Sequence, residues 1–367
     1  MSEVNILLVS GGSLVGQNVI DALAGRRQSV RLVATNLLPD VASLFDCDAV
    51  YLTPPTYPDC TAFEARLLDI VETENPDLIV PCRDDDVAFL AGLRERRTDL
   101  AHRILCGNAA TARATIDKWS SALFCREYGL PFAPSLATPI DEETLMRFAT
   151  EHGLPLLIKP RQGFAAKGVY LVFEAAHLRR AAGQEGLVVQ RYLAGRGDLD
   201  AYLEEMRTTG VPIFRSFDDI KHSIQIVIGP DGELLGNFCS RNFRRYGNTI
   251  RFERHDGADA RSLGERCAKA FGAAGWRGPM NIQCQLTSDD ELVIYEFNGR
   301  FSGATAARRI MGFDEVGLTV KAFTGAAIQP STFGDGAQSI RHLLDRPVAR
   351  QADMDTLAGT GRWQGAE

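Results

Sequence analysis

Apolar residues in the first part of the chain form short runs that alternate with amphipathic segments. The runs cover residues 5–10, 31–35, 77–81 and 103–107, and helical spacing of apolar residues follows the first run and recurs at 61–74 and 86–95. Short apolar runs bounded by turn residues indicate buried strands, and strands that alternate with helices are typical of a parallel sheet covered on both faces. The pattern predicts a doubly wound parallel sheet, of α/β class, over residues 1–110.

The pattern changes after Asn108. A proline-bounded segment, 131–134, leads to apolar runs at 154–160, 168–173 and 187–193, which predict a small α+β unit with a glycine-containing loop. From about residue 219, longer runs flank an expected helix at 258–274 and predict an antiparallel region. The predicted divisions are 1–110, 111–190, 191–330 and a peripheral, partly frayed C-terminal segment, 331–367.

Composition narrows the classes of function. Hydrophobic residues make up 45% and charged residues 24% of the 367 residues, as in a globular protein that folds in water. The net charge of -7 disfavours a broad nucleic-acid surface. The chain shows no membrane-length apolar run and no signal-peptide pattern at its start, so we expect a cytoplasmic protein with neither a membrane nor a nucleic-acid partner. Its eight cysteines show no zinc-binding spacing.

A glycine-rich turn, Ser10-Gly11-Gly12, follows the first apolar run, with Gly16 just beyond it. Backbone amides at such a strand-to-helix turn can face a phosphate or carboxylate. The spacing differs from G-x-G-x-x-G, and Thr35-Asn36 stands where an acidic residue would end the second strand. A structural turn is the favoured interpretation, ahead of a substrate-facing turn and of a dinucleotide site.

The segment 159–168 has a lysine at each side of a loop of mostly small residues. Lys159 ends an apolar run, Gly163 lies within the loop, and Lys167 and Gly168 follow it. Small side chains allow backbone N–H groups to approach phosphate oxygens, and the lysines offset negative charge. A surface hairpin with solvated lysines is the alternative, but a buried, unpaired ammonium at Lys159 would be costly. The segment therefore predicts a phosphate-binding loop.

Two polar strands near residue 290 carry the strongest signal. Side chains alternate along a strand, so the polar residues fall on one face of each: Asn281, Gln283 and Gln285 on the first, and Glu296, Asn298 and Arg300 on the second. A loop at 288–291 would place Gln283 opposite Glu296 and Asn281 opposite Asn298. Leu292 and Ile294 are expected on the face of Glu296, which argues against a merely solvated face. Such oxygen donors suit a nucleotide-bound Mg²⁺, with Arg300 beside a phosphoryl group.

Together these motifs resemble the ATP-grasp superfamily, in the branch of the carbamoyl-phosphate synthase large chain and similar carboxylate-amine ligases. The resemblance covers about residues 1–325 and is most specific at N-I-Q and at Y-E-F-N-G-R-F-S-G-A-T-A-A. It implies a pre-ATP-grasp domain at 1–110, a small lobe with the phosphate loop at 111–190 and a large lobe with the metal site at 191–330.

The resemblance also implies roles for individual residues. Glu296 and Asn298, helped by Gln283, would hold magnesium. Lys118, Lys159 and Lys167 would contact the nucleotide phosphates, and Arg300 would stabilise an acyl phosphate. The strand at 188–193, with Gln190, Arg191, Tyr192 and Leu193, matches the interdomain hinge, where the backbone at Arg191 and Leu193 would bind adenine.

The chain departs from the family after the hinge, where residues 196–219 form an apparent insertion. The family places an acidic ribose-binding residue here. Asp198 is one candidate, Asp218 and Asp219 are others, and the aligned position could instead hold Lys221.

The acceptor side offers two charged groups. Arg241 and Arg245, with Arg244 between them, could bind a substrate carboxylate or phosphate, although an exposed basic turn explains them nearly as well. Asp84 and Asp85 follow the strand at 77–81 and could receive an amine, or could cap the next helix.

The sequence thus predicts an ATP- and Mg²⁺-dependent ligase, with Mn²⁺ as a possible substitute, that activates a carboxylate as an acyl phosphate for attack by an amine or ammonia. A homodimer is the expected assembly. The alternatives are an enzyme that forms carboxyphosphate from bicarbonate, a nucleotide-binding protein without catalysis, and an NAD-dependent oxidoreductase.

Overall fold

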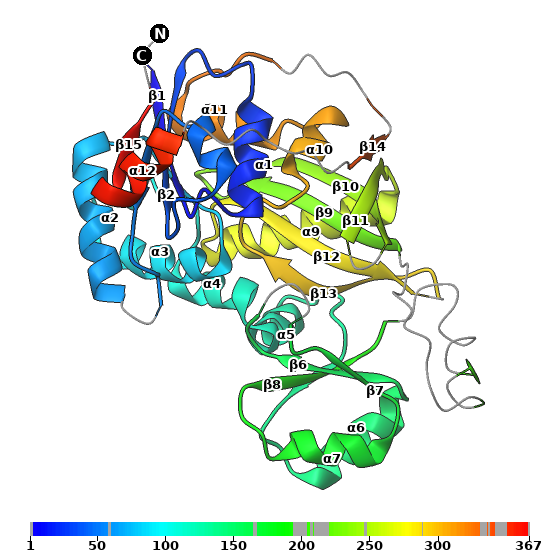
Figure 1. Ribbon diagram of the computed structural model, residues 1–367. Helices are drawn as coiled ribbons and strands as arrows, with labels where there is room; N and C mark the ends of the chain where they lie inside the picture. The colour runs from blue at the N-terminus through cyan, green and yellow to red at the C-terminus, as the bar shows by residue number, and fades with distance from the viewer. Residues whose placement is uncertain are drawn as a thin grey trace.

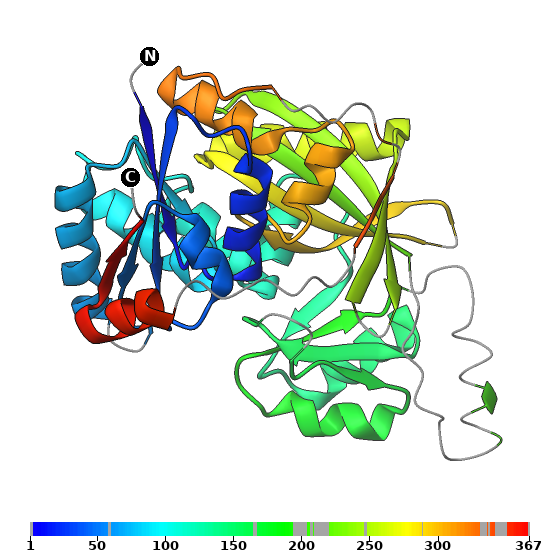
Figure 2. The same ribbon diagram turned by 45° about the horizontal axis from the view of Figure 1, so that its top comes forward.

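The computed structural model describes residues 3–57, 60–163, 167–193, 204–205, 208, 220–245, 248–287, 289–330, 336, 338–341 and 351–365. The described chain forms three sheets with helices packed on them (Figure 1). Figure 2 shows that the smallest sheet and its helices form a lobe beside the two larger sheets. A parallel sheet followed by antiparallel ones agrees with the predicted fold class.

The N-terminal sheet has the strand order β15-β3-β2-β1-β4. Its strands are β1 (Val4–Val9), β2 (Val30–Asn36), β3 (Ala49–Leu52), β4 (Leu78–Pro81) and β15 (Arg362–Gln364), and the connecting helices are α1 (Leu14–Leu23), α2 (Cys60–Glu74) and α3 (Asp84–Arg96). Strand β1 pairs in parallel with both β2 and β4. The chain therefore reverses its winding direction between β1 and β4, where Ser10 and Asp84 follow the two strand ends.

The edges of this sheet differ from the prediction. The expected strand at 103–107 forms only one bridge, between Ile104 and Ile79, because the chain soon turns into α4 (Ala109–Ile116), capped by Asn108. Strands β3 and β15 had not been predicted. β15 pairs antiparallel with β3, and Leu357 of α12 (Gln351–Thr360) is fully buried. Part of the C-terminal segment therefore supplies an edge strand of the first sheet.

The small lobe is a four-stranded sheet with its own core. Its strands, in spatial order, are β5 (Ser135–Ala137), β8 (Leu187–Arg191), β6 (Leu156–Pro160) and β7 (Tyr170–Val172), and α6 (Glu142–His152) and α7 (Ala175–Ala182) pack on it. Helices α4 and α5 (Lys118–Glu127) instead join the core of the larger sheets through Ala112 and Cys125. The small lobe therefore begins near β5, later than the predicted residue 111.

The large sheet has the order β13-β12-β9-β10-β11-β14. Its strands are β9 (Ile220–Ile228), β10 (Leu234–Arg245), β11 (Asn248–Arg254), β12 (Gly278–Leu286), β13 (Leu292–Asn298) and β14 (Gln338–Ile340). One face packs on α9 (Ala258–Ala274), and the other meets α10 (Thr305–Ile310) and α11 (Glu315–Thr324). No helix in the described ranges has the length and apolarity to cross a membrane.

The β12–β13 hairpin forms the predicted residue pairs, but with a different turn and with a bulge. Gln283 lies opposite Glu296, and Asn281 lies opposite Asn298. However, Leu286 pairs with Leu292, one residue earlier on β12 than expected, and a bulge at Tyr295 restores the predicted register. The bulge also reverses the alternation of side chains, so Leu292 and Ile294 lie in the core with Phe297. Their predicted position on the face of Glu296 is therefore wrong.

Candidate functional site

Lys159 lies near the end of β6, in a chain of buried hydrogen bonds. Its side chain is only 5% exposed, and Nζ donates to Oε1 of Gln190 over 2.7 Å. Nε2 of Gln190 donates to Oγ of Ser135 over 3.0 Å, and that hydroxyl donates to the carbonyl of Ala133 over 2.8 Å. Because this series of hydrogen bonds ends on a backbone carbonyl, it holds the ammonium group in one position.

The surroundings of Lys159 also determine its charge. Burial lowers the pKa of its ammonium group to about 8, opposed by the Glu296 carboxylate and reinforced by the ammonium groups of Lys118 and Lys221. Lys159 is therefore protonated at neutral pH and loses its proton in a mildly alkaline solution.

Lys118 links the hairpin to the glycine-containing loop. It is the first residue of α5, and Asp117 caps that helix and pairs with Arg161 over 2.8 Å. Lys118 Nζ lies 3.4 Å from Oε1 of Glu296 and donates to the carbonyl of Gly163 over 3.2 Å. Two lysines from different elements thus act on the same carboxylate.

The loop itself is described only at its ends. Gly168 has a φ of +72°, and a Cβ at this position would lie 3.0 Å from Cγ of Pro160. Both facts favour glycine at this position. Lys167 is exposed, and phosphate contacts by Gly163, Lys167 and Gly168 stay a prediction.

The three predicted magnesium ligands share one face of the hairpin. Oε1 of Gln283 accepts a hydrogen bond from the Tyr295 hydroxyl over 3.0 Å. Oδ1 of Asn298 accepts from Arg300 over 3.0 Å, while its buried Nδ2 has no partner among the described residues. No group of three His, Cys, Asp or Glu side chains that could hold a metal occurs in the described chain. One carboxylate with two amides fits a magnesium ion that takes its other ligands from nucleotide phosphates and water.

Arg300 connects this hairpin to the N-terminal sheet. Its Nε and Nη2 donate to the two carboxylate oxygens of Asp84 over 2.8 and 3.1 Å. Asp85 is 57% exposed and pairs with Arg83. Both aspartates thus pair with arginines, and their amine-binding role stays a prediction.

Asp86 stabilises the conformation of Ser10 in the glycine-rich turn. It is fully buried and accepts a hydrogen bond from Oγ of Ser10 over 2.9 Å. Burial raises the pKa of Asp86 to about 7, although the Ser10 hydrogen bond acts in the opposite direction. Ser10 has a φ of +58°, so this contact holds the turn in a conformation that is uncommon for serine.

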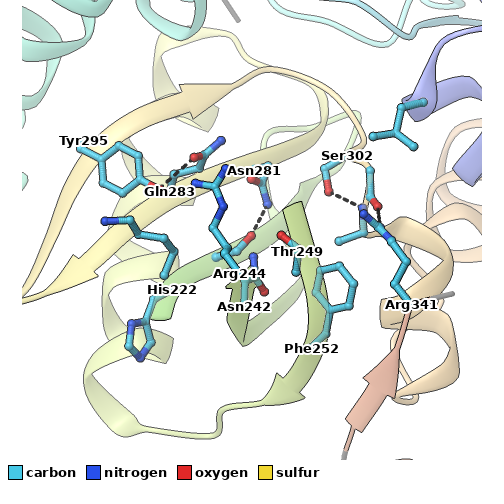
Figure 3. A pocket seen from close by; sticks show the side chains of 15 residues that line it. His222, Asn242, Arg244, Thr249, Phe252, Asn281, Gln283, Tyr295, Ser302 and Arg341 are labelled. Atoms are coloured by element: carbon cyan, nitrogen blue, oxygen red, sulfur yellow. Dashed lines mark hydrogen bonds between the residues drawn. The ribbon is translucent and has the colours of Figure 1, made fainter. Parts of the chain in front are cut away.

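A cavity of about 230 Å³ lies beside the hairpin (Figure 3). It is lined by Leu14, Lys221, His222, Ser223, Asn242, Arg244, Thr249, Phe252, Asn281, Gln283, Tyr295, Ser302, Gly303, Ala304 and Arg341.

The cavity revises the arginine prediction. Side chains alternate along β10, so Asn242 and Arg244 face the cavity while Arg241 and Arg245 occupy the opposite face. Arg241 is exposed and pairs with Glu253 over 2.8 Å. Sequence reasoning did not identify Arg341 at all, because no local pattern relates it to residues so far back in the chain.

The hinge strand ends earlier than expected. β8 stops at Arg191, whose N–H donates to the carbonyl of Pro134 over 2.9 Å, and Leu193 beyond it is buried. Adenine contacts by Gln190, Arg191, Tyr192 and Leu193 stay predictions, and Asp198 lies outside the described residues.

Comparison with solved structures confirms the predicted ATP-grasp fold. No family model and no curated protein sequence matches the chain.

Three solved structures illustrate the similarity. N5-carboxyaminoimidazole synthetase from Staphylococcus aureus matches with a TM-score of 0.64 at 12% identity, over 90% of this chain and 80% of that one. The biotin carboxylase domain of 2-oxoglutarate carboxylase from Hydrogenobacter thermophilus, a dimer with MgADP, ADP and bicarbonate, matches with a TM-score of 0.63 at 17% identity, over 90% and 72%. N5-carboxyaminoimidazole synthase from Aspergillus clavatus, with ADP and 5-aminoimidazole ribonucleotide, matches with a TM-score of 0.61 at 14% identity, over 91% and 80%.

Proposed function

We propose that this protein is an ATP- and Mg²⁺-dependent ligase that joins a carboxylate to an amine or ammonia through an acyl phosphate. One observation carries the proposal. Glu296 lies on a hairpin that also presents Gln283 and Asn298, and Lys118 and Lys159 act on its carboxylate from other elements. The adenine nucleotides in structures of the same fold support it.

The proposed roles of the site residues are to hold the metal, bind the phosphates and stabilise the acyl phosphate. Glu296, Asn298 and Gln283 would hold Mg²⁺, which when bound neutralises charge on the transferring phosphoryl group; Mn²⁺ accepts the same oxygen ligands. Lys118, Lys159 and Lys167 would bind nucleotide phosphates. Arg300, oriented by Asp84, would stabilise the acyl phosphate.

The proposed reaction has two steps. An oxygen of the substrate carboxylate attacks the γ-phosphorus of ATP, the bond to the β,γ-bridging oxygen breaks, and ADP leaves. The nitrogen of the amine then attacks the acyl carbon, loses a proton to solvent, and expels phosphate. Catalysis comes from positioning and charge neutralisation at fixed groups, since neither step needs a protein nucleophile.

Bicarbonate is the second candidate for the acid. Two similar structures are carboxyaminoimidazole synthetases, and a third contains bicarbonate. In that case the first step would form carboxyphosphate, and the amine product would be a carbamate.

The direct test is release of ADP and phosphate with pooled carboxylates and amines, followed by the mass of the product. We expect release that requires both an acid and Mg²⁺, and a product mass equal to the two substrates less water. Labelled bicarbonate recovered in the product would favour the second candidate. ATP turnover that does not depend on any acid would contradict both. The expected homodimer can be checked by sedimentation.

Nucleotide binding is expected to be coupled to proton uptake by Lys159. Phosphate anions favour its ammonium form and raise its pKa, so nucleotide binding at pH 8 should take up about half a proton, and almost none at pH 6.5. Calorimetry of MgATP binding in buffers of different ionisation enthalpy measures this uptake.

Gln190 provides the matched control. The Gln190→Glu variant would place a carboxylate next to Nζ of Lys159, which in the wild type lies 2.7 Å from Oε1 of Gln190. Lys159 should then stay protonated at pH 8, so the uptake should disappear although the lysine is present. Equal uptake in the wild type and in Gln190→Glu would show that another group takes the proton.

A further inference from the structure

The cavity in Figure 3 connects the reactive hairpin to a more distant group of residues. Gln283 and Asn281 on β12 line it on the hairpin side. Arg341, Phe252 and Ser302 line it on the side toward α10. A substrate whose reacting carboxylate lies beside Gln283 therefore has room to extend toward Arg341.

Arg341 is a cation with no carboxylate partner in the part of the chain that the structure describes. One Nη group donates to the carbonyl of Gly303, and the guanidinium lies 5.0 Å from the centre of the Phe252 ring. It makes no ion pair with any residue that the structure describes, and burial lowers the pKa of its guanidinium. A half-buried guanidinium of this kind is costly unless an anion completes its surroundings.

The other residues that line the cavity are also suited to bind an anion. Arg244 and Lys221 add two cations, and Asn242, Thr249 and Ser302 add neutral hydrogen-bonding groups. None of the fifteen described lining residues is an aspartate or glutamate. Phe252 and Leu14 supply apolar surface. A cationic cavity with polar and apolar walls suits a small organic anion.

We propose that the carboxylate substrate carries a second anionic group, a carboxylate or a phosphate, and that Arg341 and Arg244 bind this remote group. This inference rests on the proposed function, because it takes the reacting carboxylate to lie at the hairpin. Arginine binds both kinds of anion through paired N–H donors. The remote group would set the distance of the first carboxylate from Arg300 and would exclude acids with only one charge.

The test compares acids that differ only in the remote group. Succinate is paired with butyrate, and O-phosphoserine with serine, and binding to the full chain is measured by calorimetry without ATP. We expect at least one dianion to bind, its singly charged or neutral counterpart to bind roughly 10- to 100-fold more weakly, and the Arg341→Met variant to lose the difference.

Arg241→Met is the control, since it removes an exposed arginine from β10, on the face opposite to the cavity-lining Arg244. It should keep the wild-type preference. Arg341→Lys should recover part of it, which separates lost charge from a disturbed fold.

The proposal is overturned if no dianion binds the wild type, if each pair binds equally, or if Arg341→Met keeps the preference. The ADP-release assay separates this failure from failure of the ligase. Ligation of singly charged acids alone would retain the proposed function and reject the remote-anion site. Dianion binding that depends on Arg341, without ATP turnover on any acid, would retain the site and reject the ligase.

Discussion

Replacing Glu296 with alanine is expected to lower acid-dependent ADP release by roughly 100- to 1,000-fold, the usual effect of removing a charge-stabilising group from a catalytic site. Glu296 is the one carboxylate among the three proposed magnesium ligands, and it lies 3.4 Å from Lys118. Its loss removes the ligand that attracts the cation most strongly. Steady-state rates at several Mg²⁺ concentrations should show that excess metal restores little of the activity.

Glu253→Ala is the control for this experiment. Glu253 is a carboxylate of the same large sheet, and it pairs with Arg241 away from the hairpin. This variant should keep wild-type turnover. Full activity of a folded Glu296→Ala enzyme would exclude Glu296 from the site.

Replacing Arg308 with methionine is expected to destabilise the protein by about 3–5 kcal/mol, because it leaves a buried carboxylate without its partner. Nε and Nη2 of Arg308 donate to Oε1 of Glu315 over 2.9 and 2.7 Å, and the side chains are 0% and 1% exposed. Arg308 also donates to Oγ of Ser302, which lines the cavity. Urea unfolding measures the loss, and dianion binding should weaken with it.

Two further measurements test the cause of this loss. The Arg308→Met/Glu315→Leu double variant should recover much of the stability, since it buries no unpaired charge. The single variant should also recover stability as the pH falls, because burial raises the pKa of Glu315 and the protonated carboxyl group carries no charge. A single variant as stable as the wild type would show that the pair contributes little.

Local patterns were sufficient for much of this protein. The apolar runs predicted β1, β2, β4 and several strands of the other sheets, because backbone geometry imposes the spacing of buried side chains. The hairpin interpretation also predicted the pairing of Gln283 with Glu296, although the bulge at Tyr295 was needed to restore that register. Lys159, near the end of β6, was identified because a buried ammonium group without a partner would be costly.

Errors arose where the geometry depends on distant residues or on a local irregularity. The bulge at Tyr295 inserts one residue, so the face predicted for Leu292 and Ile294 was reversed. The sequence also offered Arg241, Arg244 and Arg245 for a substrate anion without deciding among them, and only the structure shows that Arg244 lines the cavity, which depends on where α10 packs.

The sequence by itself determined many of the strands and helices along the chain, the individual motifs of the ATP-grasp resemblance and the polar face of the hairpin. Each of these depends on residues a few positions apart. Only the tertiary structure decided that Asp84 pairs with Arg300 across 216 positions, that β15 joins the first sheet, and that Arg341 reaches the cavity. These contacts form when separately folded elements pack together, and residue spacing carries no record of that packing.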